Sequence, residues 1–213
     1  MTSTLHLLDT LPVPPEWSFG GGTSLAVQYG HRFSYDIDAF VGGSDVIRAL
    51  SPNRNPATKA LLNGRKYEYP GNYLKLVLDS GEIDFIVGGS RTDRPVETWQ
   101  FEGRDVPIDT PWETAVKKMF YRPSTFKVRD VFDLAAVVER HPDELRASMA
   151  EIDDRLPRLL DRVDHLRPVY AKLAVDDVNP TESGRKYMST AAIDSIFEFL
   201  RDYQQGNGAQ DRL

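Results

Sequence analysis

The sequence contains no cysteine and only four histidines. The absence of cysteine excludes disulfides and thiolate zinc sites, and it is compatible with a reducing compartment. The histidines are scattered, so a histidine metal cluster is not expected. Long apolar runs are also missing, because no stretch approaches the ~18 residues of a membrane-spanning helix. The first residues lack the basic and apolar regions of a signal peptide. We therefore expect a cytoplasmic protein with no membrane partner.

Basic charge is in the minority, because 26 Lys and Arg residues stand against 32 Asp and Glu residues, for a net charge of −6. This balance argues against a surface that binds nucleic acid everywhere by charge, although it allows a local basic patch. The 213 residues are 40% hydrophobic and 27% charged. Such a composition is typical of a globular chain with one large or two small domains.

One segment near the N-terminus begins with a glycine-rich turn. The glycines at 20–22 have no Cβ atoms, and they precede Thr23 and Ser24, which we expect to cap a short helix through Gln28. The free N–H groups at such a helix start attract anions, above all phosphates. Glycine-rich turns before helices are nevertheless common in proteins that bind no nucleotide.

Two aspartates follow on a predicted strand over 35–41. Asp36 and Asp38 are two residues apart, so the alternation of a strand places both carboxylates on one face while Ile37 points to the other. Two carboxylates on one face invite a divalent cation. A nucleoside triphosphate requires both phosphate donors and cations, so the turn and the acid pair together indicate more than either does alone.

A predicted β-hairpin supplies a third acid. Residues 73–79 and 82–87 read as strands around Ser80-Gly81. In the second strand, Asp84 lies among apolar residues, and an unpaired carboxylate would be costly there if buried. We therefore expect Asp84 to be exposed, paired or bound to metal. Asp79 is the alternative acid, but its place beside the turn favours a role in forming that turn.

The pattern of the remaining chain changes near residue 109. Before that point we expect two short helices and a last hairpin, over 44–50, 57–63 and 96–108. After it, the chain reads as helix with little strand, beginning at Thr110-Pro111-Trp112-Glu113. Later helices are predicted over 127–138, within 142–173 and over 190–204, with a disordered tail over 206–213. We therefore predict an α+β fold with a core over 1–109 and a helical part over 110–213.

Two of the predicted helices carry charges beside their apolar faces. In the helix over 111–122, Lys118 lies near the edge of the apolar face and Lys117 lies farther round. The next helix places Asp130 and Asp133 on nearly one side. On amphipathic helices such charges are usually solvated or paired with one another.

Several of these motifs resemble those of the nucleotidyltransferase family of AbiEii/AbiGii toxins, within the polymerase-beta-like nucleotidyltransferase superfamily. Gly21-Gly22-Thr23, Gly30-His31-Arg32, Ser34 and Asp36-Ile37-Asp38-Ala39-Phe40 look like the first family motif. Residues 115–122 look like its lysine-containing helix, and Arg129-Asp130-Val-Phe-Asp133-Leu134 is similar to its Arg-Asp-x-x-Asp-Leu motif. The resemblance covers roughly residues 17–140, in the family's order.

The resemblance implies a nucleotidyltransferase fold, with a mixed sheet flanked by helices and a helical part that completes the cleft. It implies transfer of a nucleoside monophosphate from an NTP, with Mg²⁺ as the cofactor. Asp36, Asp38 and Asp84 would hold the metal. Lys118 would neutralise triphosphate charge, and Asp130 would orient that lysine or a second basic group, whereas Asp133 would hold the helix pair together. The residues implied to bind nucleotide are Gly21, Gly22, Thr23, Ser24, Arg32, Ser34 and Lys117.

Lys118 is preferred to Lys117 as the site lysine, because Met119 supplies the apolar residue expected after it. The resemblance also implies a toxin of a toxin–antitoxin or phage-defence pair, with an antitoxin protein as partner and RNA such as tRNA as acceptor. The acidic surface leaves open nucleotidyl transfer to a small molecule or a protein. A module without catalysis, which binds nucleotide or a partner protein, is the other alternative.

Overall fold

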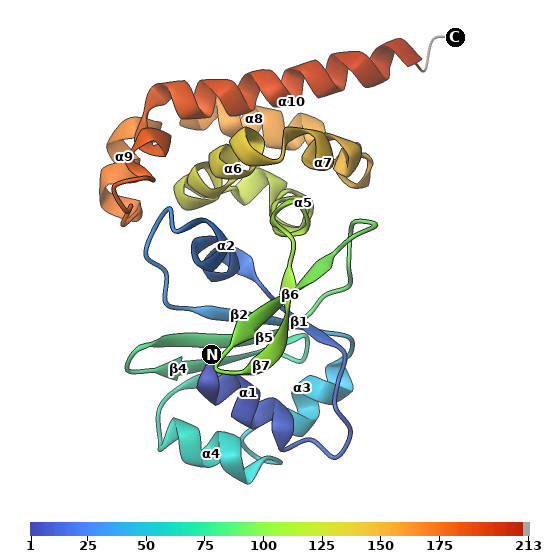
Figure 1. The fold of residues 1–213 in the computed structure, drawn as a ribbon, viewed down its shortest axis with the longest axis vertical. Coiled ribbons are helices and arrows are strands. Elements are labelled where there is room, and N and C mark those ends of the chain that lie inside the picture. The colour runs from blue at the N-terminus through green and yellow to red at the C-terminus, as the bar shows by residue number, and fades with distance from the viewer. Residues whose placement is uncertain (211–213) are drawn as a thin grey trace. The chain divides into compact units, whose positions relative to one another are not determined.

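The computed structural model describes residues 1–210, with side chains through Gly206. These residues form a mixed sheet and a series of helices, which confirms the predicted α+β fold class (Figure 1). Two compact units are present. The sheet unit consists of Met1–Ser24, Ser34–Ser90 and Val96–Asp109, and the helical unit consists of Leu25–Phe33, Arg91–Pro95 and the chain from Thr110 onward.

The sheet unit contains a seven-stranded sheet in the order β3-β4-β5-β2-β1-β7-β6. Its strands are β1 (Trp17–Gly20), β2 (Ile37–Val41), β3 (Tyr67–Glu68), β4 (Tyr73–Leu78), β5 (Gly81–Val87), β6 (Val96–Phe101) and β7 (Arg104–Asp109). β2 runs parallel to β5, and β1 runs parallel to β7, whereas the other neighbouring pairs are antiparallel. The sheet is therefore mixed, as predicted.

Both predicted hairpins are present, but the first has a different turn. β5 begins at Gly81, so Asp79 and Ser80 form the connection instead of Ser80 and Gly81. Gly81 has a φ of +136°, a conformation that glycine adopts without a steric penalty. No strand was predicted at β1 or β3, and β2 begins at Ile37 instead of Tyr35.

Three helices cover one face of the sheet (Figure 1). They are α1 (Thr2–Asp9), α3 (Ser44–Leu50) and α4 (Pro56–Leu62). Alternate residues of β2 and β5, such as Ala39 and Phe85, are buried in the core beneath them. α4 begins where the Asn55 side chain accepts the N–H groups of Ala57 and Thr58. The intervening strand residues belong to the opposite face of the sheet.

From Thr110 onward, the described part of the helical unit forms six α-helices and three short 3₁₀ helices. They are α5 (Pro111–Tyr121), η1 (Pro123–Thr125), α6 (Val128–Arg140), α7 (Pro142–Ala147), η2 (Met149–Ile152), α8 (Leu156–Leu166), α9 (Tyr170–Asp177), η3 (Arg185–Met188) and α10 (Thr190–Gln210). α5 starts as predicted, because the Thr110 hydroxyl accepts the N–H of Glu113 and Pro111 occupies the first turn.

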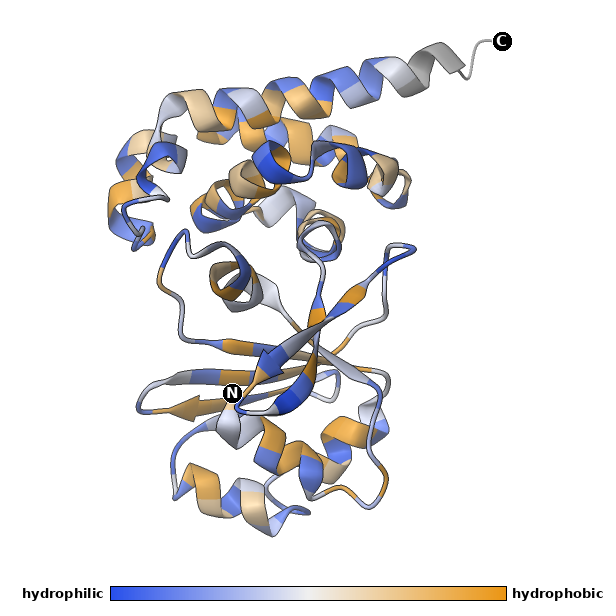
Figure 2. Ribbon diagram, in the orientation of Figure 1, coloured by the Kyte–Doolittle hydropathy of each residue, from blue (hydrophilic) through white to orange (hydrophobic). Residues whose placement is uncertain are grey.

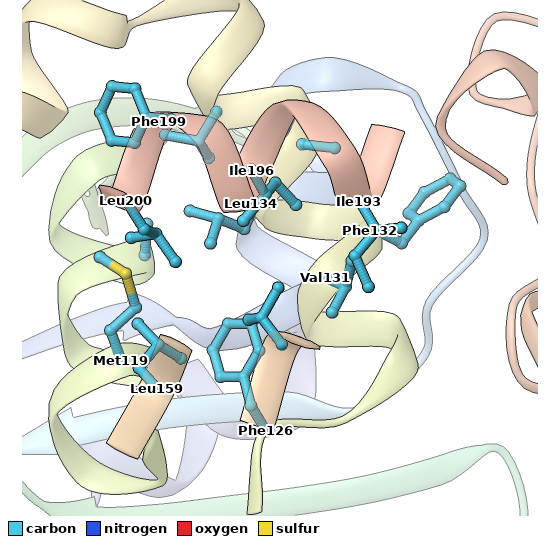
Figure 3. Packing of buried hydrophobic residues seen from close by; sticks show 14 of the residues in the cluster. Met119, Phe126, Val131, Phe132, Leu134, Leu159, Ile193, Ile196, Phe199 and Leu200 are labelled. Atoms are coloured by element: carbon cyan, nitrogen blue, oxygen red, sulfur yellow. The ribbon is translucent and has the colours of Figure 1, made fainter. Parts of the chain in front are cut away.

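The predicted tail is wrong over 206–210, because α10 runs to Gln210, whereas 211–213 lie outside the described residues. Apolar side chains from α5, α6, α8 and α10 fill the centre of the unit, among them Met119, Phe132 and Leu200 (Figure 3). Figure 2 shows both hydrophobic and hydrophilic residues along these helices, as expected of amphipathic helices that bury one face in a core. Within the described chain, no helix combines the length and apolar character needed to cross a membrane.

Candidate active site

Asp38 and Asp84 are direct neighbours on the sheet. β2 and β5 run parallel with these two residues opposite each other, on the face that the three core helices leave uncovered. Asp36 immediately precedes β2, and its Oδ1 accepts the backbone N–H of Glu82 at 3.0 Å. All three aspartates are half-buried. The fold therefore gathers the three predicted metal-binding acids at one place within the sheet unit.

The Asp38 carboxylate lies against the first residue of α2 (Gly21–Tyr29). Gly20 is paired with Asp38 across β1 and β2, and Gly21 has a φ of +72°. A Cβ atom at Gly21 would stand 1.8 Å from Asp38 Oδ2. Only glycine allows both this backbone conformation and this approach. The start of a helix and an acid of the strand pair are thus brought into contact.

The predicted caps of this helix are corrected by the structure. Thr23 and Ser24 lie inside the first turn of α2 instead of preceding it, because the left-handed Gly21 turns the chain directly from β1 into the helix. The Ser24 hydroxyl donates to the Gly21 carbonyl at 2.9 Å. The Thr23 and Ser34 hydroxyls lie 2.7 Å apart. Two predicted phosphate-binding hydroxyls therefore meet at the start of the helix.

Lys75 is a charged neighbour of Asp84 that the sequence did not reveal. β4 and β5 pair with Lys75 opposite Asp84, and Lys75 Nζ lies 3.1 Å from Asp84 Oδ2. Lys75 also forms an ion pair with Glu82. The signal that could have identified this lysine is the hairpin register, which depends on the turn. A turn at Ser80-Gly81 would not have paired these residues, whereas the observed turn does.

Asp84 has one satisfied and one unsatisfied oxygen. Oδ1 is buried and has no hydrogen-bond partner among the described residues, and the side chain is 18% exposed. Burial raises the pKa of Asp84 above its usual range, and the charges of Glu82 and Asp36 raise it further, although Lys75 opposes the shift. The ionised carboxylate thus lies in an environment that is short of positive charge.

This arrangement fits a divalent cation in its chemistry. In the described part of the chain, no three His, Asp or Glu side chains already form a cluster able to hold a metal ion. Two observations favour the sheet acids as the place for one. Asp38 and Asp84 are cross-strand neighbours, and Asp84 Oδ1 is buried without a hydrogen-bond partner in the part of the chain that the structure describes. Carboxylate oxygens are the ligands that Mg²⁺ prefers, so Asp36, Asp38 and Asp84 are the residues that could hold it.

Lys118 belongs to a buried ionic network in the helical unit. Its Nζ lies 3.3 Å from Asp130 Oδ1 and also pairs with Asp133 Oδ2. Arg122 donates to Asp130 Oδ1 at 2.8 Å. The Lys118 side chain is only 7% exposed. These contacts place Asp130 beside Lys118, and they join α5 to α6 through Asp133, as predicted for that residue.

Asp133 is the centre of this network. It is fully buried, and it accepts hydrogen bonds from Arg32 Nε at 2.7 Å and Arg32 Nη2 at 3.0 Å. His31 Nε2 lies 2.9 Å from Asp133 Oδ1. Burial alone would raise the pKa of Asp133, but the Lys118 charge and the hydrogen bonds from His31 and Arg32 hold that pKa well below its usual range. His31 belongs to the Gly30-His31-Arg32 part of the first family motif, but no role in the site was predicted for it.

Lys117 has a separate partner. Its Nζ lies 3.2 Å from Glu113 Oε1 one turn earlier on α5, and both side chains are buried. Glu113 also accepts the Arg91 N–H at 2.9 Å and the Thr92 hydroxyl at 2.8 Å. This carboxylate therefore ties Lys117 to the segment Arg91–Pro95.

The predicted site residues fall into two sets, one in each unit. The sheet unit brings together the acids and the start of α2, whereas the helical unit contains the lysines and their partners. The first set is Gly21, Gly22, Thr23, Ser24, Ser34, Asp36, Asp38 and Asp84, and the second is Arg32, Lys117, Lys118 and Asp130. The participation of the second set in the same site stays a prediction.

Comparison with known proteins places this arrangement in context. Residues 6–198 match the family described as "Nucleotidyl transferase AbiEii toxin, Type IV TA system". No curated protein sequence matches the chain. The structure is similar to that of MenT4, a nucleotidyltransferase toxin from Mycobacterium tuberculosis, with 16% identity and a TM-score of 0.55 over 95% of this chain and 83% of that one.

Two further solved structures share the fold. JHP933 from Helicobacter pylori is 13% identical with a TM-score of 0.53, over 99% of this chain and 93% of that one. The antibiotic-resistance factor ANT(2″)-Ia is 14% identical with a TM-score of 0.50, over 77% of this chain and 95% of that one. At these identities the structural likeness establishes the fold alone, and the family match carries the assignment of the chain.

Proposed function

The chain belongs to the AbiEii family of nucleotidyltransferase toxins, and we propose that it performs Mg²⁺-dependent transfer of NMP from an NTP to an acceptor hydroxyl at the sheet acids. One observation carries this proposal. Asp38 and Asp84 are paired in register on neighbouring strands, and Asp38 touches the first residue of α2. A cation site beside a helix start suits a triphosphate with its metal.

In the sheet unit, different residues are proposed to bind the phosphates and the metal. The N–H groups of Gly21 and Gly22, with the hydroxyls of Thr23, Ser24 and Ser34, bind phosphate oxygens at the positive end of α2. Asp36, Asp38 and Asp84 would hold the metal. Bound Mg²⁺ would neutralise phosphate charge and make the acceptor hydroxyl easier to ionise.

Asp84 is the residue best suited to receive the proton of the acceptor hydroxyl. Asp84 lies opposite Asp38 in the strand pairing, so its carboxylate would be close to the hydroxyl that the proposed metal would activate. The acceptor oxygen attacks the α-phosphorus of the NTP and forms a phosphodiester bond. The bond from that phosphorus to the β-phosphate bridging oxygen breaks, and pyrophosphate leaves.

We assign Lys118 the task of neutralising triphosphate charge, with Asp130 as the residue that orients it. The ion pair between them supports this assignment, because a lysine held by a carboxylate keeps one position. Arg32 and Lys117, both held by buried carboxylates, stay predicted nucleotide contacts. Exchange of Lys118 for Met tests the assignment, because the apparent KM for NTP should rise and kcat should fall.

RNA such as tRNA is the acceptor that we propose. The motif resemblance implies such an acceptor. Tyr35 adds structural support, because this residue precedes Asp36 and is 68% exposed, and exposed aromatic rings stack on nucleobases. The test is incubation of the chain with each labelled NTP and separate pools of RNA, protein and small molecules. Label in the RNA pool, absent with Asp38→Asn, supports the proposal. Label only in the protein or small-molecule pool overturns the RNA acceptor.

A cognate antitoxin is the proposed partner, in a toxin–antitoxin or phage-defence system, since the family is described as part of a type IV system. Expression of the chain should slow cell growth, and co-expression of an adjacent gene should restore it. An expressed Asp38→Asn variant should be harmless without that gene. Equal toxicity of this variant would show that toxicity does not depend on nucleotidyl transfer.

A further inference from the structure

A single row of residues crosses the face of the sheet opposite the three core helices, perpendicular to its strands. Successive strand pairings place Glu68 beside Lys75, Lys75 beside Asp84, Asp84 beside Asp38, and Asp38 beside Gly20. Cross-strand partners on one face lie close enough for their side chains to interact. The row therefore places one lysine next to the acids that we assign to the cation, on the side away from the start of α2.

Lys75 forms ion pairs with Asp84 and Glu82 instead of pointing into solvent. Its Nζ contacts Asp84 Oδ2 at 3.1 Å and also pairs with Glu82, and its side chain is only 24% exposed. Asp84 Oδ1 is left without a partner among the described residues. One oxygen of Asp84 is thus fixed by an ammonium group, while the other is buried and available to a cation.

We propose that Lys75 is a positioning residue that fixes Asp84 and weakens the binding of a free divalent cation, so that the metal arrives with the NTP. This inference rests on the proposed function, since it requires the sheet acids to be the cation site. Three aspartates without a counter-charge would bind a divalent cation strongly by themselves. Lys75 lowers the local negative charge, and the phosphates of the arriving NTP supply the missing ligands and charge.

The orientation of Asp84 is the second consequence. A carboxylate that shares a site with other acids is pushed away from them by like charge. The hydrogen bond from Lys75 to Oδ2 opposes this movement and keeps Oδ1 in place. Loss of Lys75 should therefore affect turnover and free-cation affinity in opposite directions, which general damage to the fold would not do.

The test measures Mn²⁺ binding to the full chain without nucleotide, by electron paramagnetic resonance of the free ion. Lys75→Met should tighten Mn²⁺ binding about tenfold, because one positive charge beside the ligands is lost. The same variant should lower kcat for NMP transfer. Lys75→Arg keeps the charge and should bind Mn²⁺ like the natural chain.

Lys59→Met is the matched control. Lys59 lies exposed on α4, one of the three helices on the opposite face, and its loss changes the net charge equally. Its Mn²⁺ affinity should not change. If Lys75→Met does not fold by circular dichroism, Lys75→Gln takes its place, with the same expectation.

Two failures can be told apart. If Asp38→Asn leaves Mn²⁺ binding unchanged, the sheet acids are not the cation site and the proposed function is wrong as well. If Asp38→Asn abolishes binding but Lys75→Met binds Mn²⁺ no more tightly than the natural chain, only the role of Lys75 is overturned.

Discussion

Two groups of carboxylates in this molecule have opposite surroundings. In the helical unit, Asp133 is fully buried and contacts Lys118, Arg32 and His31, and Asp130 contacts Lys118 and Arg122. In the sheet unit, Asp84 shares one lysine with Glu82 and has a buried oxygen without a partner among the described residues. Asp133 and Asp130 each contact at least two cationic side chains, whereas Asp84 shares a single lysine with Glu82.

The pKa shifts of the two groups differ in the same way. The pKa of Asp84 is raised, chiefly by burial, and that of Asp133 is lowered despite greater burial, because the Lys118 charge and its other partners outweigh it. A carboxylate that is neutralised inside the protein supports structure, and one that lacks positive charge is suited to an external cation. We therefore expect changes in the sheet acids to affect chemistry and changes in Asp133 to affect folding.

The largest effect should come from Asp38→Asn. Loss of a metal-binding charge should lower kcat/KM by about 10³-fold or more, roughly 4 kcal/mol in transition-state stabilisation. The free energy of unfolding without metal should change by less than about 1 kcal/mol, because the residue is half-buried beside other acids. Steady-state kinetics and urea unfolding measure the two quantities. A near-normal turnover would disprove the metal assignment.

Asp133→Asn should show the opposite pattern. Removal of the buried charge leaves Lys118 and Arg32 without their shared partner, at a cost of about 3–5 kcal/mol in the free energy of unfolding. Asp194→Asn is the control, because its ion pair with Arg167 is about one third exposed and should contribute at most about 1 kcal/mol. Equal losses in the two variants under urea would contradict the structural role of Asp133.

Lys118→Met tests a residue with two roles, because this lysine belongs to the buried network and is also assigned to the nucleotide. We expect a rise in the KM for NTP and a loss of about 2–4 kcal/mol in transition-state stabilisation. Lys117→Met should have much less effect on transfer, since Lys117 pairs with Glu113 on the same helix. A larger kinetic loss with Lys117→Met would assign the role to the other lysine of the doublet.

The smallest effect concerns pH. Because the pKa of Asp133 is lower in the folded chain, its contribution to stability is complete above the unfolded value of about 3.9 and is lost as pH falls through the folded value. The difference in the free energy of unfolding between the natural chain and Asp133→Asn should therefore be constant from pH 7 to about 4. Below about pH 4 this difference should become smaller. Urea unfolding at a series of pH values measures it. A difference that closes well above pH 4 would contradict this assignment.

The sequence predicted the features that depend on local pattern. Alternation placed Asp38 and Asp84 opposite the core residues of their strands, as the structure has them. The capping residues at Thr110 and Pro111 located the start of α5, because caps act within one turn. The glycine-rich turn also lies where it was expected, at the start of a helix.

The features that were not predicted depend on the register of paired strands or on contacts between residues far apart in the sequence. The lysine beside Asp84 follows from the turn at Asp79-Ser80, and either of two adjacent turns was compatible with the strand pattern. His31 and Asp133 are 102 residues apart, so no local pattern connects them. Helix α2 was expected to begin after a capping hydroxyl, but the left-handed Gly21 starts it directly.

We expect the cation to bind at the sheet acids and not at the helical ones. The most direct measurement is a crystal structure with Mn²⁺ and a non-hydrolysable NTP analogue, using the anomalous signal of the metal. We expect an anomalous peak in direct contact with Asp38 and Asp84, with the triphosphate at the first turn of α2. A peak at Asp130 or Asp133, with none at the sheet acids, would contradict this expectation.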